Sequence, residues 1–221
     1  MEATLAGKPS FAHIHFILRA GEGLIAEPDA MASMDTGVEI DTRLNGKPLA
    51  ALAKWLLGGE SLFINYLQNE ALERQRLTIT QSYPGDIHQI ELENESICLQ
   101  PGAFICCSTG LELSASYAGF ASFIARAGLF KQVVRGSGTL YFGAFGGIVE
   151  KQVEDVYIVD SGHLLAYEPH LRLKTQLSGK IFSSIFGKEG LVTKIEGTGR
   201  IILQTRSLKG IVGWLNPLLP S

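Results

Sequence analysis

The chain has 221 residues, of which 46% are hydrophobic and only 19% are charged, and its formal net charge is −3. This composition excludes an intrinsically disordered chain, which would carry fewer apolar residues and more charge. It also argues against a nucleic-acid-binding protein, because such proteins neutralise phosphates with a basic stripe. The longest basic stretch here is the short run ERQR at residues 73–76.

Residues 1–10 lack the basic and apolar regions of a secretory signal peptide. No apolar run approaches the ~20 residues that cross a bilayer. The start is also not rich in arginine, so no import signal is recognisable. We therefore expect a cytoplasmic protein without a transmembrane segment.

Three cysteines, Cys98, Cys106 and Cys107, occur without a CxxC motif. Adjacent residues of a strand point to opposite faces of a sheet, so Cys106 and Cys107 should not form a disulfide with each other. We expect three buried, reduced thiols with a structural role.

The first predicted strands belong to a repeated pattern. Residues 14–40 align without a gap with residues 87–113, so that each residue matches the one 73 positions later, as His15 matches His88. Apolar and polar residues alternate in both segments, which predicts half-buried strands. Such self-similarity indicates an internal duplication.

A third and shorter copy is predicted at residues 156–177. Here Gly162 and Glu168 match Gly21 and Glu27 of the first copy. Fewer positions agree than between the first two copies, so this match is the weaker one.

The segments between the copies repeat as well. Residues 130–142 resemble residues 191–203, and both place a Gly-X-Gly turn between two predicted strands. The corresponding segment of the first copy is residues 62–79. It has Asn69 near the first glycine and a few extra residues, 70–76, at the turn.

Short helices are predicted between the strands. The run PLAALAKWLL at residues 48–57 begins with proline and is followed by two glycines, as helices often begin and end. Residues 118–127 and 180–186 look like shorter equivalents. Residues 207–215 form a further turn or two of helix that ends before Pro217.

We predict one all-β domain built from three two-part units. The units span about residues 11–83, 84–152 and 153–208, and residues 209–221 form a C-terminal tail. The units should superpose by a pseudo-threefold rotation, with His15 over His88 and Gly21 over Gly162.

Several longer runs resemble those of a known family. They are GGESLFINYL from Gly58, PGAFICCSTGLEL from Pro101, YIVDSGHLLAYEP from Tyr157, GKEGLVTKIEGTGRIILQTR from Gly187 and AEPDAMASMD from Ala26. Their order and spacing are similar to those of the altered-inheritance-of-mitochondria family, in the group of its twenty-fourth member, over residues 11–206. The resemblance implies a fold like that of the trp RNA-binding attenuation protein, within the double-stranded β-helix class, and it implies homo-oligomers. It implies no catalytic residues, because that family has none established.

Two aspartates resemble the paired carboxylates of aspartic proteases. Asp35 and Asp160 each lie in an apolar-Asp-Thr/Ser-Gly run, and protease chemistry needs two carboxylates that share one proton. In the repeat alignment, however, Asp35 corresponds to Ser108 and Asp160 corresponds to Arg19. We therefore expect the two aspartates to lie well apart and to shape turns.

Histidines raise a metal-binding alternative. His13 and His15 are two positions apart on a predicted strand, so both can face one metal ion, and with Glu22 they resemble the first motif of the cupins. His88, in the run PGDIH, resembles the second cupin motif. Glu22 lies too far from the histidines for the usual motif, and the third copy has Val156 at the equivalent position. A complete ligand cage is therefore not visible, and His13, His15 and His88 stay metal candidates only.

The glycine-rich stretches do not resemble phosphate loops. Residues 136–138 and 143–147 are flanked by predicted strands, and no GK[ST] motif follows them. This favours β-turns. Ser108 and Ser114 lie in no GxSxG nucleophile motif. We predict no catalytic residue, no cofactor-binding residue and no cofactor.

The leading interpretation is a non-enzymatic, self-assembling β protein that binds or organises an unknown protein or small ligand. A cupin-like metal-binding protein or enzyme that uses the three histidines is the alternative. RNA binding by analogy with the fold is a second alternative, in which Tyr141 and Tyr167 stack on bases. Few basic residues accompany these tyrosines, so the nucleic-acid signal is weak.

The C-terminal tail favours a homo-oligomer with mostly apolar contacts. Residues 208–215 are mostly apolar, and Lys209 carries their single charge. The two glycines of this segment make it a poor isolated helix, so we expect it to dock on another surface. Open strand edges of the repeated units also invite pairing.

Overall fold

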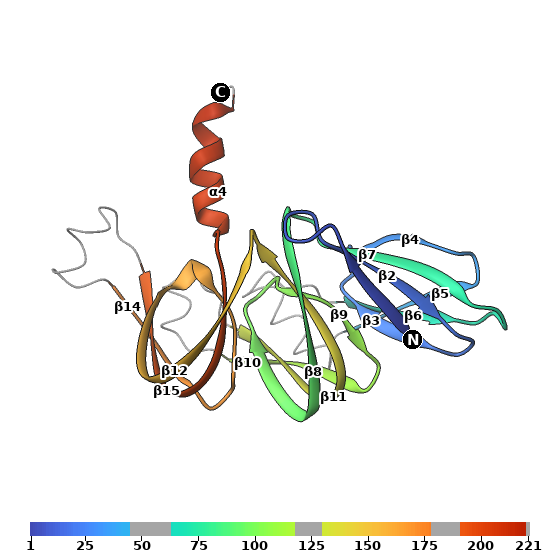
Figure 1. Ribbon diagram of the computed structural model, residues 1–221, viewed down its shortest axis with the longest axis horizontal. Coiled ribbons are helices and arrows are strands. Elements are labelled where there is room, and N and C mark those ends of the chain that lie inside the picture. Colours follow the sequence, from blue (N-terminus) through green and yellow to red (C-terminus); the bar gives the residue numbers. More distant parts are fainter. Residues whose placement is uncertain (45–62, 118–129, 178–190, 220–221) are drawn as a thin grey trace.

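The computed structural model describes four stretches of the chain, which are residues 1–44, 63–117, 130–177 and 191–219. Within them the protein is almost entirely β-structure, with antiparallel strands in two sheets and one α-helix (Figure 1). This confirms the all-β prediction. The short helices predicted at residues 48–57, 118–127 and 180–186 lie outside the described residues.

The strands form a smaller and a larger sheet. The smaller sheet has the order β1 (Glu2–Ala6), β2 (His13–Leu18), β7 (Gln75–Thr80) and β4 (Met31–Met34). The main path of the larger sheet is β12 (Ile148–Asp160), β15 (Leu191–Gln204), β13 (Leu164–Tyr167), β8 (Gly85–Leu99), β11 (Phe130–Phe145), β9 (Phe104–Ser108), β3 (Gly23–Ala26), β6 (Phe63–Asn69) and β5 (Val38–Leu44). Two further strands lie off this path: β10 (Leu111–Tyr117) pairs with β11, and β14 (Arg172–Leu177) pairs with β15.

Three hydrophobic cores lie along the described chain. The N-terminal core contains side chains of the smaller sheet such as Ile14, Phe16 and Leu77. The C-terminal core contains side chains of β13 and β15 such as Leu164 and Ile195. Each core is filled mainly by side chains of one predicted two-part unit, as expected if each unit forms its own strands. The stretches of chain up to residue 83, from 84 to 152 and from 153 to 208 are called the first, second and third part below.

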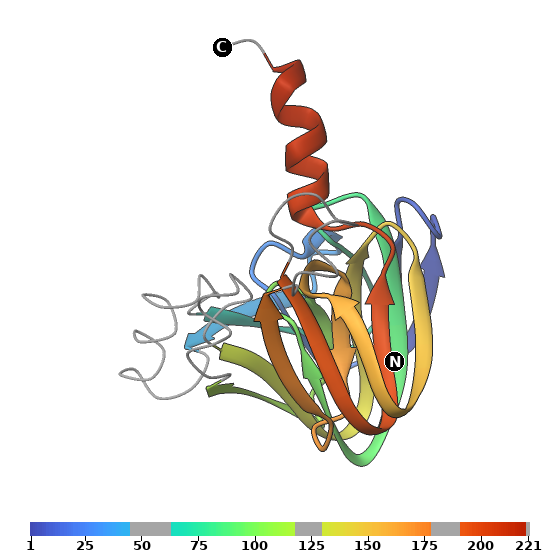
Figure 2. The ribbon, with the colours of Figure 1, turned by 90° about the vertical axis from the view of Figure 1, so that its left-hand side faces the viewer.

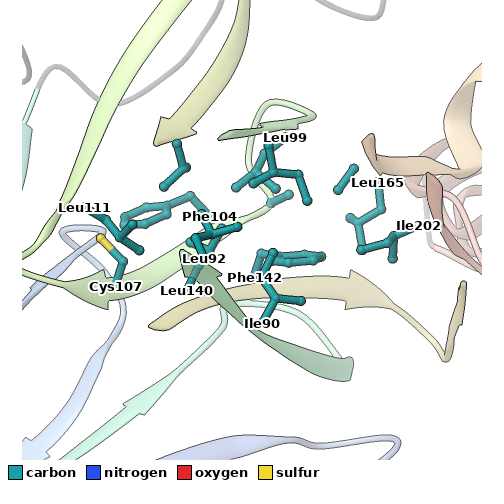
Figure 3. Packing of buried hydrophobic residues seen from close by; sticks show 14 of the residues in the cluster. Ile90, Leu92, Leu99, Phe104, Cys107, Leu111, Leu140, Phe142, Leu165 and Ile202 are labelled. Carbon is teal, nitrogen blue, oxygen red and sulfur yellow. The ribbon is translucent and has the colours of Figure 1, made fainter. Parts of the chain in front are cut away.

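The central core also receives side chains from both neighbouring parts (Figure 3). Leu92 and Phe142 come from β8 and β11, whereas Leu165 and Ile202 come from the C-terminal part and Ile25 from the N-terminal part. Full burial of an apolar side chain of this size stabilises the fold by roughly 1.5–3 kcal/mol. The shared core therefore holds neighbouring parts together.

The strand pairings follow one pattern along the chain. β4 pairs with β7, β9 pairs with β11, and β13 pairs with β15. Each of these pairings shifts register at one point. The shift leaves one residue of the shorter strand without an opposite partner in each case, which is Ala32, Ile105 or Leu165. β5, β10 and β14 lie along β6, β11 and β15 in the same way. Only in the first part do residues 70–74 divide the long strand into β6 and β7.

The third part begins at a different register from the one its sequence match indicated. That match aligned β13 with β3, whereas β13 pairs with β15 as β9 pairs with β11. Gly162 is therefore not the counterpart of Gly21, and the counterpart of Glu168 is Asp35 rather than Glu27. The match was wrong because glycine and Glu-Pro mark the ends of two different short apolar strands, so a motif of this length recurs at both.

The two Gly-X-Gly motifs lie inside long strands rather than at turns. Gly136 in β11 and Gly197 in β15 both have a φ of 123°, a backbone conformation that favours glycine. Both strands continue through these positions without ending. The turn expected within residues 143–147 is present between β11 and β12, where Gly146 has a φ of 73°.

The C-terminal helix α4 (Leu208–Leu215) stands away from the sheets and leads into the 3₁₀ turn η2 (Asn216–Leu218), as Figures 1 and 2 show. The Ser207 hydroxyl begins the helix by accepting a hydrogen bond from the N–H of Gly210 at 3.2 Å. No residue of α4 is buried, so the helix has no docking surface on the described part of the chain. None of the helices within these ranges is long and apolar enough to cross a membrane.

Candidate functional site

The three histidines of the metal-binding alternative lie on two strands. His13 and His15 project from one face of β2 with their ring centroids 4.8 Å apart. Nδ1 of His13 lies 3.2 Å from the carbonyl oxygen of Phe11, and Nδ1 of His15 lies 3.1 Å from Thr78 Oγ1. His88 lies on β8 in the larger sheet. Over the described ranges, no group of three or more His, Cys, Asp or Glu side chains is placed to hold a metal ion.

His88 lies in a small cluster of charged side chains. Its Nε2 is 3.3 Å from Glu150 Oε1, an ion-pair distance without hydrogen-bond geometry. Arg200 Nη1 is 3.9 Å from the other oxygen of this carboxylate, and Lys8 Nζ is 3.5 Å from Asp86 Oδ1. Burial lowers the pKa of His88, and although Glu150 opposes this, Lys8 and Arg200 lower it further. The surroundings therefore favour the neutral imidazole.

This cluster could not be found from sequence spacing. Its members come from the loop after β1, from β8, from β12 and from β15, and only Asp86 and His88 share a run that resembles a metal-binding motif. A neutral imidazole beside a carboxylate can accept a proton. Glu150, however, also has the Arg200 guanidinium 3.9 Å away, which offsets part of its negative charge.

Asp35 and Asp160 have separate structural roles. Asp35 follows β4, and its Oδ2 accepts hydrogen bonds from the backbone N–H and from Nε of Arg76 at 2.8 and 3.2 Å. The Arg76 side chain holds the pKa of this carboxyl below its usual value. Asp160 ends β12 and caps the 3₁₀ turn η1 (Ser161–His163) by accepting the N–H of Gly162 at 2.9 Å. β4 and β12 lie in different sheets at opposite ends of the molecule (Figure 1), so these carboxylates share no proton.

A side-chain acceptor occurs at the end of each of three short strands. Asp35, Ser108 and Glu168 each accept a hydrogen bond from a backbone N–H of the neighbouring strand, at 2.8, 2.8 and 3.0 Å. All three stand at the end of the short strands β4, β9 and β13. An aspartate and a serine can therefore align here because both side chains accept the same kind of hydrogen bond.

The cysteines are buried and free of disulfides, as expected from the sequence. Cys98, Cys106 and Cys107 all lie inside the fold. Burial raises the pKa of Cys107 to about 12, and it raises the pKa of Cys106 well above its usual value. Such thiols are poor nucleophiles and poor metal ligands, because the thiolate is the reactive form.

Exposed apolar side chains gather on the C-terminal segment. They are Leu208, Val212, Trp214, Leu215, Leu218 and Leu219. Burial of apolar surface is worth about 25 cal/mol per Å², so this segment would gain free energy by binding an apolar surface. Exposed clusters of this kind mark interaction sites in many proteins.

Comparison with known proteins gives the family. The family model described as mitochondrial biogenesis AIM24 matches residues 3–206. The chain belongs to this family. An uncharacterized protein of Streptococcus pyogenes serotype M6 is 26% identical to this AIM24-family chain over 230 residues, covering 100% of the chain and 92% of the relative. The X-ray crystal structure of a second Streptococcus pyogenes protein, SPYM3_0169, is similar with a TM-score of 0.78 and 25% identity, covering 99% of each chain.

Membership of the AIM24 family assigns no reaction to the sites described above. The similar proteins carry names that state no activity.

Proposed function

We propose that this AIM24-family protein is a non-enzymatic, self-assembling β protein that binds or organises a partner. The observation that carries the proposal is the apolar helix α4, which has no buried residue. A helix that buries nothing gains little from its own fold, because most helical stability comes from packing an apolar face. Contact with another molecule supplies that packing.

We also propose that the body consists of three units with the double-stranded β-helix fold of the trp RNA-binding attenuation protein. The equivalent register shifts of β4, β9 and β13 support this. The acceptors Asp35, Ser108 and Glu168 support it too, as does the φ of 123° shared by Gly136 and Gly197. Repeated units of this kind suit a protein that presents surfaces rather than one that builds a single catalytic centre.

The contacts of the motif residues support a non-enzymatic role. Asp35 is paired with Arg76, and Asp160 caps a 3₁₀ turn. His15 contacts Thr78 on the neighbouring strand. Each of these side chains has a structural partner that accounts for its presence.

Light scattering or sedimentation velocity at low micromolar concentration tests self-assembly. We expect a mass that is a multiple of the 23.9 kDa chain. Trp214→Asp places a charge on α4 and should lower the measured mass. The matched control Leu72→Asp changes an exposed leucine in the loop between β6 and β7 and should leave the mass unchanged. A monomer mass for the unaltered protein would contradict the proposal.

Metal analysis of the purified protein tests the alternative. We expect no stoichiometric transition metal, because His13 and His15 lie on β2 and His88 contacts Glu150 in the larger sheet. One bound metal per chain that is lost on His13→Ala and on His88→Ala would establish the cupin-like function instead.

A further inference from the structure

Neighbouring parts of the chain are joined by one recurring strand pairing. β3 of the first part pairs antiparallel with β9 of the second, where Ile25 lies opposite Cys107. β8 of the second part pairs in the same way with β13 of the third, where Cys98 lies opposite Tyr167. All four of these residues are buried. The junctions therefore belong to the core of the molecule.

This series of junctions stops at both ends of the molecule. β12 is the counterpart of β8. Ile158 of β12 lies opposite Lys194, three positions before Gly197, and Cys98 of β8 lies opposite Val133, three positions before Gly136. Both glycines have a φ of 123°. β4 is the counterpart of β9 and β13, so Met34 takes the place of Cys107 and Tyr167. Within the described residues, β12 and β4 are edge strands. They lie at opposite ends of the molecule (Figure 1).

The exposure of these strands differs from that of their counterparts. Ile158 is 43% exposed, whereas its counterparts Cys98 and Ile25 are 0% and 4% exposed. Met34 is 38% exposed, whereas its counterparts in β9 and β13 are 1% and 5% exposed. Three of the four residues of β4 are exposed, whereas all four of β13 are buried. Both ends thus have the surface that an inner part would have if its neighbour were removed.

The end of β12 at residues 156–159 and the whole of β4 lack the charges that keep sheet edges apart. Charged side chains on an edge strand oppose pairing with another strand. The first half of β12 carries several, including Glu150, Lys151 and Glu154, but residues 156–159 read VYIV. β4 reads MASM. The uncharged stretch of β12 coincides with the stretch that forms the junction in β8.

We propose that β12 of one copy pairs antiparallel with β4 of a second copy and so continues the internal junctions. The proposal rests on the self-assembly proposed above and names a surface for it. In the register of the β3–β9 junction, Ile158 lies opposite Met34 of the second copy, and Val159 lies opposite Ser33. Because two different surfaces meet, the contact is heterologous and builds a closed ring or an open filament.

One backbone hydrogen bond follows from the same register. At the internal junctions the N–H of Gln100 donates to the carbonyl oxygen of Leu165 at 2.9 Å, and Glu27 donates to Ile105 at 2.9 Å. The counterpart between copies runs from the N–H of Asp160 to the carbonyl oxygen of Ala32. The contact between copies thus reuses the backbone geometry found twice within the chain.

Cross-linking of two variants that each carry one added cysteine tests the pairing. Opposite residues of antiparallel strands have Cα atoms about 4.5–5.5 Å apart, which fits the Cα separation of a disulfide. The variants Met34→Cys and Ile158→Cys are mixed and oxidised with diamide, and the linked peptides are identified by mass spectrometry. The native cysteines are buried and should not react. We expect a disulfide between positions 34 and 158 in the mixture, and no disulfide in either variant alone.

A control mixture and light scattering decide the matter. The control mixture of Met34→Cys with Val149→Cys uses a similarly exposed residue of the same strand, and it should give no product. Equal cross-linking in this control, or linking of either variant to itself, overturns the register and the head-to-tail arrangement. Assembly in light scattering without any link between positions 34 and 158 overturns this pairing but leaves self-assembly intact. A monomer mass instead contradicts the self-assembly on which the pairing rests.

Discussion

The Ser108 hydroxyl engages both backbone groups of Thr139: its Oγ accepts the N–H at 2.8 Å and donates to the carbonyl oxygen at 3.1 Å. Ser108→Ala removes both hydrogen bonds and should lower the free energy of unfolding by about 1–3 kcal/mol. Urea titration measures this change. Ser114→Ala is the control, because Ser114 makes a single exposed hydrogen bond at 3.3 Å, and it should change stability by less than about 0.5 kcal/mol. Equal effects of the two changes would show that the acceptor position is not structural.

Acid should destabilise the protein through Glu196. Its carboxylate lies 2.8 Å from Lys174 Nζ and 2.7 Å from Lys194 Nζ, and these lysines lower the pKa of Glu196 to about 2. Because the folded-state pKa lies below the ordinary value of 4.5, this group favours the folded state above pH 4.5. The contribution is lost as the pH falls from 4.5 toward 2. Calorimetry should show a shallower fall of Tm in this window for Glu196→Gln, and an unchanged slope would contradict the assignment.

His88 should add a second dependence on pH at milder acidity. Burial lowers the pKa of His88 below its ordinary value of 6.5, so the unfolded chain takes up the proton first. The contribution of His88 to the free energy of unfolding is therefore fully present above pH 6.5 and declines as the pH falls below 6.5. NMR titration of the imidazole measures the folded-state pKa directly. A pKa above 6.5 would mean that Glu150 outweighs burial at this site.

The first two parts of the fold could be predicted well from the sequence. The gapless match of residues 14–40 to 87–113 places β5 and β10 at corresponding positions, and both strands pair as that match requires. The extra residues after Asn69 also separate two strands as predicted. Period-two alternation carries this information because each strand has one buried face.

The rest depended on contacts that one sequence does not encode locally. The predicted alignment of β13 with β3 was wrong, because a glycine before a short apolar strand and Glu-Pro after it occur at both strands. The contact between His88 and Glu150 joins two strands with no common spacing. The exposure of Met34 and Ile158 depends on whether a neighbouring part is present, and residue type alone cannot give it.

The cysteines should be unreactive until the protein unfolds. Cys98, Cys106 and Cys107 are buried, and burial raises the pKa of Cys107 to about 12. Ellman's reagent should therefore modify no thiol in the native state at neutral pH and all three after denaturation in urea. Rapid reaction of a native thiol would show that the core opens near β8, where Cys98 lies, or near β9, where Cys106 and Cys107 lie.

Removal of the C-terminal helix should separate assembly from stability. A chain that ends at Ser207 loses α4, whose residues are not buried, so its free energy of unfolding should change by less than about 0.5 kcal/mol. Its mass in light scattering should fall, because the exposed apolar segment is gone. Phe142→Ala gives the scale of a true core change, since Phe142 is fully buried and such a truncation costs about 3–5 kcal/mol. A shortened chain that lost comparable stability while keeping its assembly would show that α4 packs on its own body in solution.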